Sequence, residues 1–122
     1  MVALRERMRA AVAPYLGPGE TIQAVFGAQT RMTPSGLAGI IIFYARNQYR
    51  LVVATSERIV VLDSGQWSMA KPRGVVGELP RQTRIDSQHG PQSPVQLGAE
   101  RLWVRRRFRT DIEAANAEAF GA

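Results

Sequence analysis

YRLVVATSERIVVLD, residues 49–63, is the stretch that decides the fold. It contains two short apolar runs, residues 51–54 and 59–62, which are separated by the polar residues 55–58. Both runs are rich in β-branched side chains, which pack well on a pleated sheet. Two such runs joined by a short polar turn are typical of a β-hairpin. We therefore predict two adjacent antiparallel strands here.

Further short strands are expected on both sides of this hairpin. Apolar and polar residues alternate over residues 20–27, which predicts a strand, and residues 28–36 have the composition of a loop. Downstream, we expect strands over 75–79 and 83–86, a loop over 87–94, and a last hairpin formed by strands 95–97 and 101–107. One antiparallel β-structure is thus expected to span residues 20–107.

Helical patterns occur at both ends of the chain. Apolar side chains recur at helical spacing over residues 1–16, which predicts an amphipathic helix. We expect it to dock on its own barrel; the alternative is that this basic helix lies on a membrane. A second helix is expected over residues 110–120, where Thr110 and Glu113 have the spacing of a capping box with Thr110 as the N-cap. One face of this helix would bury Phe108, Ile112, Ala115, Ala119 and Phe120.

Composition limits what the chain can be. At 122 residues we expect one domain, residues 1–122, and 45% apolar residues suffice for one core. Cysteine is absent, which excludes disulfides and thiolate metal sites and suggests a cytoplasmic protein. We expect no secretory signal, because no long apolar run follows the first arginines. The net charge of +6 favours anionic partners such as anionic lipid, acidic protein or nucleic acid.

Four short motifs resemble those of the bacterial pleckstrin-homology-like (PH-like) domains. They are residues 18–20 (Pro-Gly-Glu), the central hairpin with Thr55 and Arg58 in its turn, residues 78–80 (Glu-Leu-Pro), and a last strand that runs into a capped helix. The resemblance implies an α+β, mainly β fold: a partly open antiparallel β-barrel with an N-terminal helix and a C-terminal capping helix. Homo-oligomers occur among the bacterial members, so the resemblance also implies that self-assembly is a candidate property.

The first candidate site is an apolar insert at residues 35–45. It interrupts what should be a loop between the first two strands, and such loops form the rim of the usual PH-like ligand site. The insert and its flanking arginines comprise Arg31, Leu37, Ile40, Ile41, Ile42, Phe43, Tyr44, Arg46 and Arg50. An exposed insert of this kind would enter a bilayer surface or a partner groove. The competing interpretation is that these residues are core. At nine residues, the apolar run 37–45 is too short for the ~20 residues of a membrane-spanning helix.

The second candidate site is a basic strand. Successive side chains of a strand point to opposite faces, so Arg101, Trp103, Arg105 and Arg107 would share one face. Such a ladder would bind phosphates, with the indole ring stacked on a base or placed at a lipid interface. The competing interpretation is that these four side chains form a solvated face of the strand and bind no ligand. Three phosphate contacts would give a salt slope of only about −2.7, which is weak binding.

No catalytic pattern is visible. His89 is the only histidine and lies in an expected loop, and the sequence contains no P-loop and no GxGxxG motif. We therefore expect no enzyme activity, no metal and no cofactor. The leading hypothesis is a binding or adaptor module attached peripherally to anionic membrane, at its inner face. The alternative is a protein-interaction or self-assembly module that uses the insert or a sheet edge. Nucleic-acid binding by the basic strand is a weaker third hypothesis.

Overall fold

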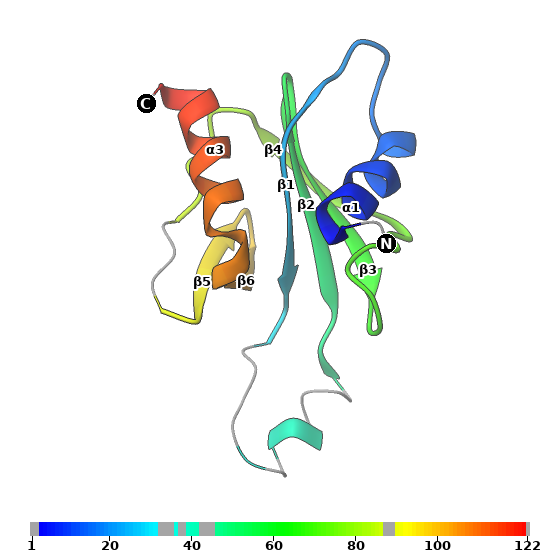
Figure 1. Cartoon of the computed structure of the whole chain (residues 1–122), viewed down its shortest axis with the longest axis vertical. Coiled ribbons are helices and arrows are strands. Elements are labelled where there is room, and N and C mark those ends of the chain that lie inside the picture. The colour runs from blue at the N-terminus through cyan, green and yellow to red at the C-terminus, as the bar shows by residue number, and fades with distance from the viewer. Residues whose placement is uncertain (1–2, 32–35, 37–38, 42–45, 87–89, 122) are drawn as a thin grey trace.

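The predicted hairpin lies in the middle of the sheet. It is formed by β2 (Tyr49–Thr55) and β3 (Arg58–Gly65), which pair antiparallel with Leu51 opposite Leu62 and Val53 opposite Val60. The structure is a computed structural model, and it describes residues 3–31, 36, 39–41, 46–86 and 90–121 (Figure 1). The remaining elements are α1 (Leu4–Val12), η1 (Ala13–Tyr15), β1 (Ile22–Gln29), β4 (Gly74–Pro80), β5 (Gln92–Leu97), β6 (Glu100–Arg105), η2 (Arg106–Phe108) and α3 (Arg109–Phe120).

The strands form one antiparallel sheet in the order β4-β3-β2-β1-β6-β5. β1 to β4 follow one another as a meander, and β5 and β6 form a second hairpin. The two parts are joined where Gln29 of β1 lies opposite Trp103 of β6. The sheet is strongly curled into a half-barrel, with α1 on one side and α3 packed against β1 on the other (Figure 1). The predicted α+β fold class, a mainly β structure with two terminal helices, is confirmed in this form.

The core has two layers because both faces of the central strands are covered. Met8 and Val12 of α1 and Ile112 and Ala115 of α3 are fully buried. Every residue from 24 to 29 and from 51 to 55 is buried as well. A strand buried on both faces needs a continuous apolar run rather than an alternating one. This explains why the central hairpin was recognisable from composition alone.

One predicted strand is wrong. Residues 83–86 are irregular, although Ile85 is fully buried. The Ile85 N–H donates to Asn116 Oδ1, and its carbonyl accepts from Asn116 Nδ2, both at 2.9 Å. A side-chain amide on α3 therefore replaces the neighbouring strand as the partner of this backbone, which satisfies its buried polar groups without a ladder.

The predicted start of the C-terminal helix is also wrong. β6 ends at Arg105, and η2 leads directly into α3, which begins at Arg109 with no side-chain cap. Thr110 is therefore inside the helix rather than its N-cap. Phe120 does not join the buried face: it is 41% exposed, and the guanidinium of Arg84 lies 4.1 Å from its ring centroid.

Candidate functional site

The register of the sheet brings several connections to one end of the molecule. Gln29 lies opposite both Tyr49 and Trp103, and Tyr49 lies opposite Gly65. The connections that follow β1 and β3, residues 30–48 and 66–73, therefore leave the sheet at the same end (Figure 1). We call this the loop end.

The β1–β2 connection displays apolar side chains at the loop end. Ile40 is 38% exposed and Ile41 is 61% exposed. The base of the connection is fixed, because Thr30 and Gln48 exchange two hydrogen bonds of 2.9 Å and the Arg31 N–H donates to the buried Asn47 side chain. The two described isoleucines are thus surface residues held above an ordered base. Four other predicted residues, Leu37, Ile42, Phe43 and Tyr44, lie outside the described part of the chain.

The β3–β4 connection contributes a residue that sequence analysis missed. Trp67 is 83% exposed. Its neighbour Met69 packs on β1 at Gly27, where any Cβ would collide with the methionine sulfur. The Met69 carbonyl also accepts a 3.0 Å hydrogen bond from Ser64 Oγ. The connection is therefore anchored while its tryptophan projects. A lone Trp between polar residues of a long connection was the available signal.

A shallow hollow of about 270 Å³ lies beside the β3–β4 connection. It is lined by Leu4, Tyr49, Trp67, Met69, Arg105 and Arg107. The predicted ladder of four residues on one strand face is wrong at its last member, since Arg107 lies in η2 with its guanidinium 5.4 Å from the Phe108 ring. Arg105 and Arg107 line the hollow together with Trp67. Trp103, by contrast, is covered by the guanidinium of Arg101 at 5.5 Å.

The arginines flanking the insert differ in their surroundings. Arg31 and Arg46 are exposed. Arg50 is only 13% exposed in its side chain and forms ion pairs with Asp63 at 3.0 Å and Glu100 at 3.1 Å. Arg50 thus ties β2 to β3 and to the β5–β6 hairpin. Lys71, on the β3–β4 connection, is exposed as well.

The opposite end of the central hairpin has a different electrostatic arrangement. Arg58 donates from Nε to Glu20 at 2.9 Å, and it also pairs with Glu78 and reaches the Tyr15 carbonyl at 3.2 Å. Glu20 is 1% exposed in its side chain. The hydrogen bond from Arg58, helped by one from Thr55, lowers the Glu20 pKa to about 2 against the opposing effect of burial. We call Arg58, Glu20, Glu78 and Thr55 the Arg58 cluster.

The Arg58 cluster unites three of the motifs that suggested the PH-like resemblance: Glu20 of the first, Thr55 and Arg58 of the hairpin turn, and Glu78 of the third. Their contacts are internal, so these motifs report the fold rather than a ligand.

Comparisons with known proteins give no matching family model, no matching curated protein and no matching solved structure. Within the described residues, no helix is long and apolar enough to cross a membrane. No group of three or more His, Cys, Asp or Glu side chains in that same part of the chain is placed to hold a metal ion.

Proposed function

We propose that this chain is a non-catalytic, PH-like binding module that attaches peripherally to an anionic membrane surface, at its cytoplasmic face, through the loop end. One observation carries the proposal. Trp67, at 83% exposure, projects from one connection of the loop end, and Ile41, at 61% exposure, projects from another. Large apolar side chains gathered at one end and rimmed by polar residues are typical of a protein or membrane contact. Tryptophan in particular favours the membrane–water interface.

Charge at the loop end favours a membrane over an apolar protein groove. Five exposed cations belong to the loop-end connections or line the hollow, namely Arg31, Arg46, Lys71, Arg105 and Arg107. Each basic residue near an anionic leaflet contributes about 1 kcal/mol at low ionic strength. Four or five of them alone correspond to roughly millimolar affinity. Insertion of the tryptophan and isoleucine side chains would add about 1.5–3 kcal/mol each if they were fully buried, which leads to roughly micromolar binding.

Nucleic-acid binding by Arg101, Trp103, Arg105 and Arg107 has less support. A single-strand binding surface needs aromatic faces that are open for stacking. The Trp103 ring already carries the Arg101 guanidinium, and Arg107 is off the strand. The proposal therefore assigns Arg105 and Arg107 to the hollow with Trp67 rather than to a nucleic-acid ladder.

The test is co-sedimentation with phosphatidylcholine vesicles, with and without phosphatidylserine, at low and at moderate salt. We expect binding only to the anionic vesicles, weakened but not abolished by salt because the apolar contact is not screened. In a Trp103→Phe background, Trp67 is the only tryptophan, and its fluorescence should shift to the blue on binding. No binding to anionic vesicles at low salt would contradict the proposal.

A matched pair of variants separates the loop end from general stickiness. Trp67→Ser removes the exposed aromatic at the loop end, and Phe120→Ser removes an exposed aromatic at the far end of α3. Only the first should lose vesicle binding. Equal loss in both variants would mean that the loop end is not the contact.

A further inference from the structure

The sheet has two edge strands, β4 and β5, which differ in how far they are protected. An exposed edge presents unpaired backbone groups to which another strand can add, and proline or charge at the edge prevents this. β5 carries Pro94, which has no N–H to offer, and the Gln96 N–H already donates to Asp86 at 3.1 Å. The β5 edge is therefore blocked at both positions.

β4 is less protected. Pro80 is only its last residue, Glu78 is its one charged residue, and a β-bulge at Val76 lies between the Val61–Gly77 and Leu62–Val75 pairs. Val75 and Val76 are 53% and 46% exposed on this seven-residue strand. Apart from the ladder with β3, the β4 backbone takes part in one hydrogen bond among the described residues. The Thr83 N–H donates it to the carbonyl of Pro80, the last residue of the strand. An open edge with exposed β-branched side chains is a template for strand addition.

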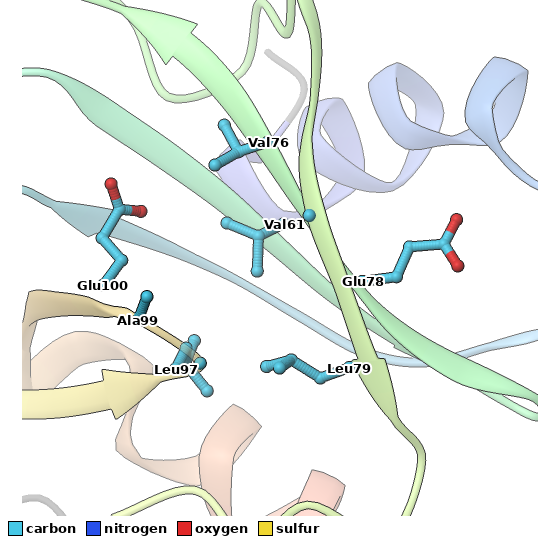
Figure 2. Close-up of a pocket in the computed structure, with 9 residues that line it drawn as sticks. Val61, Val76, Glu78, Leu79, Leu97, Ala99 and Glu100 are labelled. Atoms are coloured by element: carbon cyan, nitrogen blue, oxygen red, sulfur yellow. The ribbon is translucent and has the colours of Figure 1, made fainter.

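A groove runs along β4 where the half-barrel is open. It has a volume of about 440 Å³ and lies between β4 and the β5–β6 turn. Figure 2 shows Val61, Val76 and Leu79 on one side and Leu97, Ala99 and Glu100 on the other. At one end the groove is narrow, because the Leu79 side chain approaches Gly98 closely. A Cβ built on that glycine would lie 3.2 Å from Leu79 Cδ2. It widens from there toward Val76.

Gly77 lies in this groove, directly after the bulged residue Val76. Its φ is not positive, and a Cβ built on it would meet nothing within 4 Å. Glycine in a strand costs conformational entropy and marks a β-bulge, as at Val76, or a site where a ligand or another backbone approaches closely. The absence of a side chain here leaves room for a segment that lies directly against β4.

The charge around the groove selects its occupant. Among the described residues that line it, the charged ones are Glu78 and Glu100. Glu100 pairs with Arg50, but Arg58 must serve both Glu20 and Glu78, so one negative charge is left over beside the edge. This acidic excess sits on a chain whose net charge is +6.

We propose that the β4 edge binds an extended peptide segment of a partner protein as an added strand. Its alternate side chains are apolar and fill the groove over Val61, Val76 and Leu97, and a lysine or arginine pairs with Glu78. This surface lies beside the sheet and does not depend on the membrane contact at the loop end.

The experiment is selection of a displayed library of random heptapeptides on the full chain, with the Gly77→Thr variant as counter-selection. Gly77→Thr adds a side chain into open space on a strand, so it should fold with an unfolding temperature no lower than that of the parent. Binding of the selected peptides should fall about tenfold or more, as expected from the loss of one or two backbone hydrogen bonds. Gly74→Thr, on the same strand but outside the groove, should keep full binding.

Two further readouts decide the matter. Selected peptides should be basic and alternate apolar with polar residues. They should bind more tightly than versions in which the basic residue is exchanged for glutamate, and Glu78→Gln should reduce this difference in affinity. The proposal is overturned if nothing is enriched over the Gly77→Thr counter-selection, or if the enriched peptides are acidic. It is also overturned if light scattering shows twice 13.5 kDa for the parent and a monomer for Gly77→Thr, because a second copy would then occupy the edge.

Discussion

The two ends of the central hairpin use arginine in opposite ways. At the turn between β2 and β3, Arg58 is held by two carboxylates and a backbone carbonyl. At the loop end, Arg31 and Arg46 are exposed beside Ile41 and Trp67. A seven-residue strand separates these ends by about 24 Å. The net charge of the chain therefore says little by itself, because Arg58 at one end stabilises the fold whereas Arg31 and Arg46 at the other face outward.

The largest expected effect comes from breaking the Arg58 cluster. Arg58→Met should lower the free energy of unfolding by about 3 kcal/mol or more, because it leaves the buried Glu20 carboxylate without its cation. Urea denaturation followed by circular dichroism measures this. Arg84→Ala, at an exposed arginine outside the cluster, is the control and should change little. A loss below about 1 kcal/mol in Arg58→Met would show that the cluster is not a stability centre.

The second effect is a dependence of stability on pH. The Glu20 pKa is lowered from 4.5 to about 2 in the folded chain, so folding favours its ionised form. Its contribution is complete above pH 4.5 and is lost as the pH falls toward 2, by at most about 3 kcal/mol. Denaturation between pH 6 and pH 2 measures this slope.

The Glu20→Gln variant sharpens the acid prediction. It should be less stable at neutral pH, and its stability should change less between pH 4.5 and 2. Some slope should remain, because the Asp63 pKa is also lowered, chiefly by the Gly65 N–H and further by Arg73. If the variant lost stability with falling pH as steeply as the parent does, another carboxyl group would govern the loss of stability at acid pH.

At the loop end the expected effect is on binding rather than on stability. Ile41→Asp should change the free energy of unfolding by less than about 0.5 kcal/mol, because the side chain is 61% exposed. Vesicle binding should fall about tenfold or more, since an apolar contact is replaced by a negative charge. Unfolding of this variant would mean that the insert is core and would remove the anchor from the membrane proposal.

The smallest expected effect is at the hollow. Arg107→Ala should weaken binding to anionic vesicles about fivefold at low salt, which corresponds to about 1 kcal/mol for one cation at the surface. The difference from the parent should shrink as salt rises. Arg84→Ala, at the other end of α3, removes the same charge from a distant place and should bind as the parent does. Equal losses in both variants would point to net charge rather than to the loop end.

The sequence was most informative where neighbouring residues decide the local structure. The β2–β3 hairpin and β4 were predicted because their residues have short-range signals of type and spacing. Residues 83–86 were mistaken for a strand because the side-chain amide of Asn116 satisfies the Ile85 backbone, and this partner is 31 residues away. Thr110 was mistaken for an N-cap because η2 continues directly into α3, which begins one residue earlier at Arg109.

The candidate sites were harder to predict than the fold. The sequence pointed to Ile40 and Ile41 and to the arginines, but it gave no means to tell the exposed Arg46 from Arg50, whose carboxylate partners lie 13 and 50 residues away. It missed Trp67 and the contrast between the two edge strands. Both depend on which segments the curled sheet places side by side, and that is a long-range property.

The single register pair between Gln29 and Trp103 has a consequence for how the chain folds. β1 to β4 form from neighbouring segments, whereas β6 joins β1 only after about 70 residues of chain have been brought together. Contacts of such long range form slowly. We therefore expect the meander to fold first, and the β5–β6 hairpin with α3 to dock as a second unit. Amide hydrogen exchange in the native protein should then show this second unit opening at lower free energy than β2 and β3.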